Sequence, residues 1–313
     1  MQLIPFISQL AINEQKQWCE ALNSRLKSAR VVMPEAMSSE QISQCQCAVV
    51  ANPLASELTI FSSLKWVHSL WAGVDSLVNQ LEHPKFKIVR LVDPMLATTM
   101  AEAVLTWCLY LHRHIPLYRE QQQQALWRQH EIKPVKQHRV AILGLGELGK
   151  ASAALLNKVG FEVLGWSRTA KQLDGVQCFY GDEGVQQILS QSDTVVVLLP
   201  LTQATHHLIN QTSFGQMKKG SAIVNFARGA VVCTADLLQA LNNELLSHAV
   251  LDVFEHEPLP VQSDLWHHPK VTVTPHVSAP TNRETACDIV SGNIEYYFRT
   301  GQTPEAVNLK QGY

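Results

Sequence analysis

The sequence predicts an α/β protein of two domains, one built on a doubly wound parallel sheet and the other on a smaller sheet. The chain has 313 residues, which is long for one open-sheet domain and usual for two. Apolar strand-like segments alternate with helix-like segments along most of the chain, as in parallel sheets with right-handed crossovers. A glycine-rich turn, Gly144 to Gly149, directly follows one of these strands.

The composition describes a globular protein and argues against several classes of partner. Hydrophobic residues make up 46% of the chain and charged residues 17%, and no tract is of low complexity. The formal net charge of -2 gives no basic field for a nucleic acid. The opening MQLIPFISQLAI lacks the features of a signal peptide, and no uninterrupted apolar stretch reaches membrane-spanning length. We expect a cytoplasmic protein without nucleic-acid or membrane partners.

The seven cysteines predict buried thiols rather than a metal centre. Only Cys45 and Cys47 are close together, and a C-x-C pair without a second pair of ligands is a weak zinc signal. The sequence contains neither the H-E-x-x-H motif of metalloproteases nor the G-x-S-x-G motif of serine hydrolases. We therefore predict no metal site and neither of these two chemistries.

The N-terminal third predicts a flavodoxin-like α/β domain. We expect strands over residues 3–7, 47–51, 66–70 and 88–91, and an amphipathic helix over residues 14–28. This part has no glycine-rich phosphate turn, which favours a role in holding the substrate over a second nucleotide site.

The stretch SLWAGVDSL, Ser69 to Leu77, marks the place where a strand ends and a helix begins. Gly73 would free the backbone to present N–H groups to an anion, and open α/β sheets bind ligands at the ends of strands. A simple turn with an acidic residue, Asp75, at the start of a helix is an equally good interpretation.

The region between the domains is predicted to be helical. Residues 100–114 form a long apolar helix that Pro116 ends or kinks, and the polar segment 118–131 has a helical tendency. The polar segment is either an exposed linker or an arm that reaches a second subunit, and we take a homodimer as the expectation.

From residue 140 onward, strands and helices alternate regularly. We expect strands over 140–143, 162–166, 194–199, 222–225, 249–252 and 271–274, with helices over 148–159, 184–189, 211–217 and 235–242. This order is typical of a Rossmann-type dinucleotide-binding domain.

The glycine turn has a defined role in such a domain. Gly144 permits the tight turn, Gly146 lets the backbone approach a pyrophosphate, and Gly149 lets the helix pack closely on the strand. Alone, the motif also describes an ordinary strand-to-helix turn. The regular strands that follow favour the nucleotide site.

Residues at the end of the second strand indicate the cofactor. Dinucleotide domains for NAD have a carboxylate there that binds the ribose hydroxyls, whereas this chain has Ser167 and Arg168. A serine does not repel a 2′-phosphate, and an arginine can bind one. We therefore predict that NADPH is preferred over NADH, with a solvated surface charge as the alternative interpretation of Arg168.

Three stretches near the C-terminus supply complementary catalytic groups. NFARG contains Arg228, DVFEHEP contains Glu257, and TPH ends at His276. Each follows a strand, so the three side chains are expected at one edge of the sheet. A histidine paired with a carboxylate can give a proton to a substrate oxygen, and an arginine can bind a carboxylate and polarise a neighbouring carbonyl.

The motifs GLGELG, NFARGAVV, LDVFEHEPLP and LWHHPKVTVTPH resemble those of the D-isomer-specific 2-hydroxyacid dehydrogenases, and WAGVD and WSRT resemble their glyoxylate/hydroxypyruvate reductase A branch. The resemblance implies that Arg228 anchors the 2-oxo acid, that His276 is the proton donor and that Glu257 pairs with it. It also implies that the backbone of Ala72 and Gly73 holds the substrate carboxylate. Trp71, beside them, either narrows the pocket or packs structurally.

The resemblance further implies the domain boundaries and the cofactor residues. Residues 1–100 with 284–313 would form the substrate domain and residues 101–283 the dinucleotide-binding domain, with the active site in a cleft closed by hinge motion. The predicted cofactor-binding residues are Gly144, Gly146, Glu147, Leu148, Gly149, Ser167, Arg168, Leu199, Pro200, Ala227 and Asp252.

The leading hypothesis is an NADPH-dependent reductase that converts glyoxylate to glycolate and hydroxypyruvate to D-glycerate. Two alternatives are a dehydrogenase for a bulkier 2-oxo acid and a nucleotide-sensing binding protein similar to the corepressors that resemble this family. No tail or low-complexity arm for recruiting a partner occurs in the sequence, which argues against the sensor.

Overall fold

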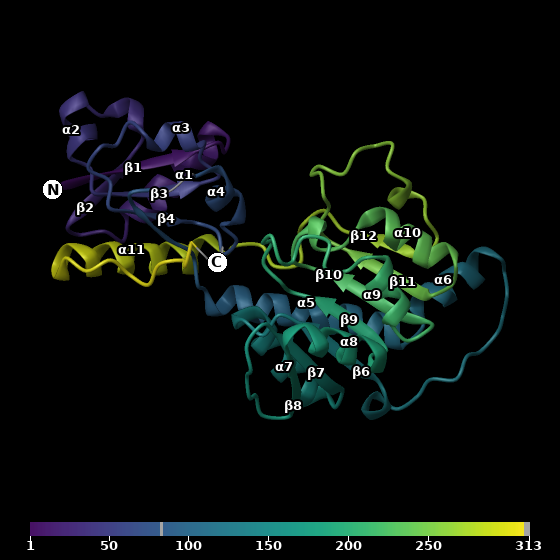
Figure 1. Ribbon diagram of the computed structural model, residues 1–313. Coiled ribbons are helices and arrows are strands. Elements are labelled where there is room, and N and C mark those ends of the chain that lie inside the picture. The colour runs from purple at the N-terminus through teal and green to yellow at the C-terminus, as the bar shows by residue number, and fades with distance from the viewer. Residues whose placement is uncertain (82–83, 310–313) are drawn as a thin grey trace. The chain divides into compact units, whose positions relative to one another are not determined.

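The computed structural model describes residues 1–81 and 84–309 of the chain, which folds into two compact units (Figure 1). The terminal unit comprises Met1–Met95 and Thr281–Tyr313, and the central unit comprises Leu96–Pro280. The first boundary falls in the first turn of the helix Pro94–His112, which begins earlier than the expected start near Met100.

The terminal unit contains a five-stranded sheet in the order β2-β1-β3-β4-β5, with every neighbouring pair parallel. This is the flavodoxin-like strand order, which confirms the fold predicted for this part. Its elements are β1 (Gln2–Ser8), α1 (Ile12–Asn23), β2 (Ala29–Val32), the 3₁₀ turn Pro34–Ala36, α2 (Ser39–Gln44), β3 (Cys47–Ala51), α3 (Ala55–Leu58), β4 (Trp66–Ser69), α4 (Asp75–Gln80), β5 (Lys87–Val89) and α11 (Arg283–Thr300).

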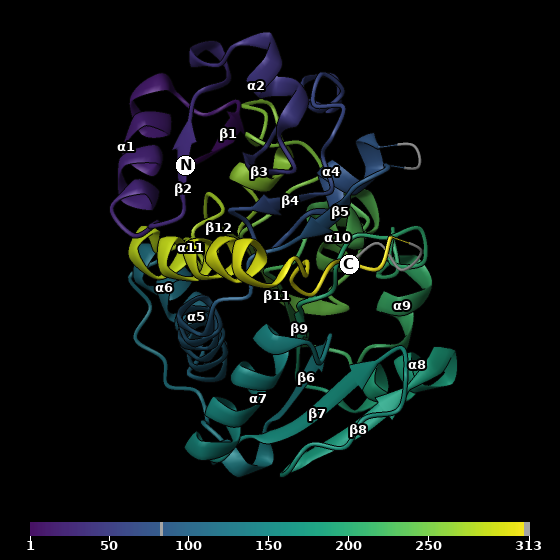
Figure 2. The ribbon, with the colours of Figure 1, turned by 90° about the vertical axis from the view of Figure 1, so that its left-hand side faces the viewer.

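Helices α1 and α11 cover one face of this sheet (Figure 2). Helix α1 ends at Asn23, earlier than predicted, because the Asn23 side-chain amide both donates to and accepts from the backbone of Val31, at 2.8 Å in each case. These two bonds turn the chain into β2, an edge strand that the hydrophobic pattern did not reveal.

The central unit contains a seven-stranded parallel sheet in the order β12-β11-β10-β9-β6-β7-β8. Its elements are α5 (Pro94–His112), α6 (Ile115–Gln123), the 3₁₀ turn Val135–Gln137, β6 (Arg139–Leu143), α7 (Glu147–Val159), β7 (Glu162–Ser167), β8 (Val176–Tyr180), α8 (Gly181–Gln191), β9 (Thr194–Val197), α9 (Gln211–Gln216), β10 (Ser221–Asn225), the 3₁₀ turn Gly229–Val231, α10 (Thr234–Asn242), β11 (Leu246–Leu251), the 3₁₀ turn Asp264–Trp266 and β12 (Val271–Val273). The direction of strand succession reverses between β6 and β9, which confirms the doubly wound Rossmann-type fold.

Two further elements of the central unit differ from the prediction. Strand β8 was not expected, because none of its residues is fully buried and an edge strand lacks a clear apolar pattern. Helix α6 ends at Gln123, well before residue 131, and the chain from 126 to 134 has no regular secondary structure. Trp127, in this segment, is 95% exposed.

Helix α5 is long and apolar enough to pass a composition test for a membrane span, the one such helix among the described residues. In this fold its apolar face belongs to the core of the central unit. Val104 and Cys108 are fully buried and pack in the same cluster as Val140 and Ile142 of β6. A long apolar helix in the core of a protein has the same length and composition as a membrane span.

The carboxyl ends of five strands lie level with one another. The register places Leu143, Val197, Asn225, Leu251 and Val273 in one row across β6, β9, β10, β11 and β12. The segments that follow these strands therefore leave the sheet along one edge. The glycine turn and the three predicted catalytic stretches all belong to this group.

Candidate active site

The glycine turn after β6 is packed so tightly that two of its three positions admit no side chain. Gly144 has a φ of +110°, and a β-carbon there would lie 2.5 Å from the carbonyl oxygen of Leu198. A β-carbon on Gly149 would lie 1.8 Å from the carbonyl oxygen of Gly144. These contacts bring helix α7 against β6, as the motif predicts.

Gly146 differs, because a β-carbon there would have no heavy atom within 4 Å. Gly146 is the N-cap residue of α7, and it has no side chain that could cap the first N–H groups of the helix. The first N–H groups of this 13-residue helix have no partner within the helix, and the positive end of its dipole lies beside the open space at Gly146. This arrangement suits the pyrophosphate of a dinucleotide. Glu147 and Leu148 form the first turn, where Glu147 pairs with Lys150 at 3.0 Å.

The end of β7 carries no carboxylate. Ser167 is buried, and its hydroxyl donates to the carbonyl oxygen of Thr169 at 2.8 Å. Ser167 thus shapes the turn in addition to leaving the position uncharged. Arg168, the next residue, is exposed.

Leu199, Pro200 and Ala227 were also predicted to contact the cofactor. Leu199 and Pro200 follow β9 and Ala227 follows β10, so all three lie at the predicted edge. Leu199 and Ala227 are buried in the core cluster of this unit, and the amide side chain of Asn225 accepts a hydrogen bond from the Ala227 N–H at 3.2 Å. Sequence reasoning had given Asn225 no part.

His276 and Glu257 come together at this edge. The Nδ1 atom of His276 lies 2.8 Å from Oε2 of Glu257, and the side chains are 53% and 36% exposed. The other oxygen of Glu257 accepts the N–H of Phe254 at 2.9 Å. Because an ionised carboxylate only accepts hydrogen bonds, Nδ1 carries a hydrogen, and Nε2 is the ring nitrogen that does not face Glu257.

Asp252 holds the His276 segment in place. Its carboxylate accepts from the Thr274 hydroxyl at 2.6 Å and from the N–H groups of Val277 and Ser278 at 2.9 Å each. Its carbonyl oxygen accepts the N–H of His276. His276 has a left-handed φ of +54°, a costly conformation that needs such support. Asp252 is only 2% exposed, so its side chain acts within the protein, and its predicted contact with a cofactor stays a prediction.

Arg228 reaches the same edge from β10. Its Nη1 atom donates to the carbonyl oxygen of Ala227 at 2.7 Å, and Asn225 donates to the carbonyl oxygen of Arg228 at 3.0 Å. At the next residue, Gly229, a β-carbon would lie 1.9 Å from the carbonyl carbon of Phe254. The arginine turn therefore rests directly against the segment that carries Glu257.

A further contact of the segment after β11 involves Glu255, which the sequence analysis left without a role. Its carboxylate accepts from the N–H and the hydroxyl of Thr234 at 3.1 and 2.6 Å, and lies 3.5 Å from Nε2 of His207. Partial burial raises the pKa of Glu255, but these hydrogen bonds and the nearby histidine outweigh it and hold the pKa below its ordinary value. Glu255 thus ties the segment after β11 to α10.

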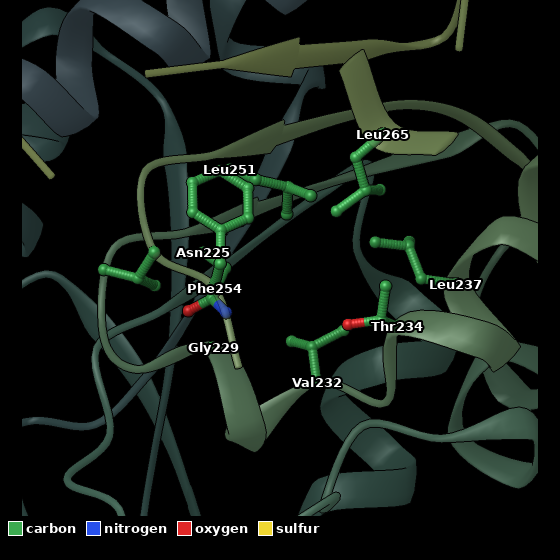
Figure 3. A pocket seen from close by; sticks show the side chains of 9 residues that line it. Asn225, Gly229, Val232, Thr234, Leu237, Leu251, Phe254 and Leu265 are labelled. Atoms are coloured by element: carbon green, nitrogen blue, oxygen red, sulfur yellow. The ribbon is translucent and has the colours of Figure 1, made fainter. Parts of the chain in front are cut away.

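A small cavity lies beside Gly229, the residue that follows Arg228 in the chain (Figure 3). Gly229, Asn225 and Phe254 line one side, and Leu237 and Leu265 line the other. Its volume of about 10 Å³ admits no more than about one water molecule, which excludes it as the binding site of a dinucleotide or an organic acid.

In the terminal unit, the predicted carboxylate loop follows β4. The Trp71 N–H donates to the Ser69 hydroxyl at 3.0 Å, and the Trp71 carbonyl accepts from the Leu91 N–H at 3.1 Å. The Trp71 ring packs edge-on against Trp18 of α1, with centroids 6.2 Å apart. Ala72 is half-buried and Gly73 is exposed, so their backbone is held beside an anchored tryptophan.

Within residues 1–81 and 84–309, no group of three or more His, Cys, Asp and Glu side chains is arranged to hold a metal ion. The edge of the central sheet instead combines a phosphate-type glycine turn with an arginine and a paired histidine. Fold and site define a dinucleotide-binding oxidoreductase of the two-domain α/β class.

Comparisons with known proteins agree with this class. The family described as D-isomer specific 2-hydroxyacid dehydrogenase, NAD binding domain, matches residues 105–278. The glyoxylate/hydroxypyruvate reductase A of Yersinia enterocolitica is 38% identical over 307 residues, which cover 96% of this chain and 97% of that protein. That of Serratia proteamaculans is 37% identical over 298 residues, or 93% and 94% of the two chains.

Two solved structures are similar over the whole length. A D-isomer specific 2-hydroxyacid dehydrogenase from Xanthobacter autotrophicus Py2, in complex with NADPH and MES, has a TM-score of 0.92 and 36% identity, covering 100% of this chain and 99% of that one. An NADPH-dependent glyoxylate/hydroxypyruvate reductase from Sinorhizobium meliloti, in complex with NADP and sulfate, has a TM-score of 0.87 and 30% identity, covering 100% of both. The chain belongs to the D-isomer specific 2-hydroxyacid dehydrogenase family, and is an oxidoreductase.

Proposed function

We propose that this protein is an NADPH-dependent reductase of small 2-oxo acids, which converts glyoxylate to glycolate and hydroxypyruvate to D-glycerate. The observation that carries the proposal is the His276–Glu257 pair, at 2.8 Å, on the same sheet edge as the glycine turn. The similarity to reductases of this name, and to structures in complex with NADPH, supports the substrate class and the cofactor.

The residues of the central unit fit NADPH. The open space at Gly146 and the uncapped start of α7 suit the pyrophosphate, and the turn of Ser167 and Arg168 suits a 2′-phosphate. When bound, the nicotinamide supplies the hydride. In the proposal the central unit binds this cofactor, and the terminal unit, through the backbone of Ala72 and Gly73, holds the substrate carboxylate.

His276 donates the proton that the reduction requires. Glu257 fixes the hydrogen on Nδ1, which orients the ring and stabilises its protonated form, so that Nε2–H is the donor to the substrate oxygen. Arg228 binds the carboxylate of the 2-oxo acid and polarises its carbonyl. Asp252 and Glu255 act as positioning residues, because each ties a segment that carries one of these groups.

The proposal includes a cytoplasmic homodimer without a nucleic-acid or membrane partner. The segment that contains Trp127, which is 95% exposed, supports a subunit contact, because aromatic side chains are enriched at interfaces between proteins. The formal net charge of -2 supports the absence of a nucleic acid.

A substrate-length series tests the proposal. Consumption of NADPH and NADH is followed with glyoxylate, hydroxypyruvate, a branched 2-oxo acid and an aromatic one. The expected result is the highest kcat/KM with the two- and three-carbon acids and NADPH. A maximum at the branched or aromatic acid would replace the proposal by a dehydrogenase for bulkier substrates. Tight nucleotide binding with no turnover of any acid would favour a sensor.

A further inference from the structure

The segment after β7 carries a second cation that the sequence analysis did not single out. The ammonium group of Lys171 donates to the backbone carbonyl oxygen of Leu145 at 2.7 Å. Leu145 stands between Gly144 and Gly146, in the middle of the glycine turn. A positive charge from the end of the second strand therefore lies against the turn that follows the first.

Other contacts hold the end of β7 against the turn. The Gly144 N–H donates to the Trp166 carbonyl oxygen at 2.9 Å. Leu145 is buried against Gly165, where a β-carbon would lie only 2.8 Å from the leucine methyl carbons. The Ser167–Thr169 hydrogen bond then bends the chain after the strand. These contacts fix both the chain segment that leads to Lys171 and the glycine turn that its ammonium group contacts.

The ammonium group has unused capacity in this position. It carries three N–H donors, and the Leu145 carbonyl takes one of them. The carbonyl is neutral, and within residues 1–81 and 84–309 Lys171 forms no ion pair with a carboxylate. Two donors and a full positive charge remain for an anion.

We propose that Lys171 recognises the 2′-phosphate of NADPH together with Arg168. The inference rests on the proposed use of NADPH and deepens it. A phosphate monoester carries a charge of about −1.5 to −2 near neutral pH, which one arginine balances only in part. The end of the second strand is where the adenosine ribose is held in such domains, whereas the pyrophosphate lies on the first N–H groups of α7. The bond to Leu145 tethers Lys171 beforehand, so little side-chain entropy is lost on binding.

Binding measurements on the intact protein test the inference without any turnover. Dissociation constants of NADPH, NADH, adenosine 2′,5′-bisphosphate and 5′-AMP are measured by calorimetry for the wild type and for Lys171→Met. We expect the variant to bind the two 2′-phosphorylated ligands about tenfold more weakly or worse, since a charge-assisted hydrogen bond is lost. NADH and 5′-AMP should change by less than about twofold.

Two control variants separate the charge from the fold. Lys171→Arg keeps a cation and should keep most of the affinity for adenosine 2′,5′-bisphosphate. Lys158→Met, at the far end of α7, removes an equal charge from an exposed site and should bind every ligand as the wild type does.

Equal weakening of NADPH and NADH by Lys171→Met would overturn the inference, because Lys171 would then only hold the glycine turn. Unchanged binding of both would overturn it as well. If the wild type itself bound NADPH no more tightly than NADH, the proposed cofactor preference would fail. The wild-type measurements alone would show this, so that failure can be told apart from a failure of the inference about Lys171.

Discussion

The two units are both parallel α/β sheets, but they hold their predicted ligand segments in different ways. In the central unit a glycine turn leaves the sheet at the reversal point and packs at distances that only glycine allows, as at Gly149. In the terminal unit the first glycine of the chain is Gly73, so strands β1 and β3 end without such a turn. Its ligand loop is held instead by an anchored side chain, Trp71. Backbone packing thus shapes one predicted site and side-chain packing the other.

The largest effect is expected in the central unit. Replacement of His276 by Ala removes the proposed proton donor and should lower kcat about 10² to 10⁴-fold, while the dissociation constant of NADPH stays near that of the wild type. Steady-state kinetics and nucleotide titration measure the two quantities. A His276→Ala variant that retains most of its activity would rule out the assigned proton donor.

Glycine substitutions sharpen the contrast in backbone packing. Gly149→Ala forces its methyl group against the Gly144 carbonyl oxygen and should lower the free energy of unfolding by about 1–3 kcal/mol, with loss of NADPH binding. The methyl group of Gly146→Ala would have no protein atom within 4 Å. This variant should therefore fold normally, and its affinity for NADPH should be the only property that falls.

A matched control lies in the terminal unit. Gly292 of α11 also has open space at its β-carbon, so Gly292→Ala should stabilise the protein by up to about 1 kcal/mol without any change in NADPH affinity. Denaturant unfolding and nucleotide titration compare the three variants. If Gly146→Ala bound NADPH as tightly as Gly292→Ala does, the phosphates would not approach at Gly146.

Much of the central unit follows from the sequence, because local spacing determines it. The order of glycines fixes the turn, and apolar strands covered on both faces, such as β10, show as continuous runs. Edge strands β2 and β8 were missed because they are only partly buried. Their existence depends on tertiary pairing and not on their own pattern.

The same distinction between local pattern and tertiary pairing applies to the residues of the site. His276 and Glu257 each lie in a segment that follows a strand, so topology alone predicts that they lie at one edge. The supporting residues could not be predicted in this way. The bonds of Asp252 to residues 274–278 and of Glu255 to Thr234 join segments distant in sequence, and only the folded chain shows them.

A smaller effect is expected from the terminal unit. Trp71→Ala removes the ring that packs on Trp18, so the backbone of Ala72 and Gly73 loses its support. The KM for glyoxylate should rise about tenfold with kcat within about threefold of the wild type. Trp71→Phe keeps an aromatic ring and should lie between the two. A drop in kcat with unchanged KM would contradict the assigned anchoring role.

The smallest effect does not distinguish the two units, because both contain buried neutral histidines. Burial lowers the pKa of His68 in the terminal unit, and of His138 and His248 in the central unit, to about 4 in each case. In the unfolded chain these groups bind protons at about pH 6.5, so stability should fall as the pH drops from about 6.5 towards about 4.

Urea unfolding at about pH 7 and about pH 5 measures this loss. His248→Gln, which removes one of the three groups, should show a smaller difference between the two midpoints. Equal midpoints at both pH values in the wild type would contradict the neutral, buried state of these histidines.

The most direct test of the proposed function is a single-turnover reaction of excess enzyme and NADPH with hydroxypyruvate, in which the product is identified by chiral chromatography and mass spectrometry. The proposal predicts D-glycerate formed in a one-to-one ratio with oxidised cofactor, and its loss in His276→Ala although NADPH still binds. Tight binding of NADPH with hydroxypyruvate recovered unchanged from the wild type would contradict the proposal.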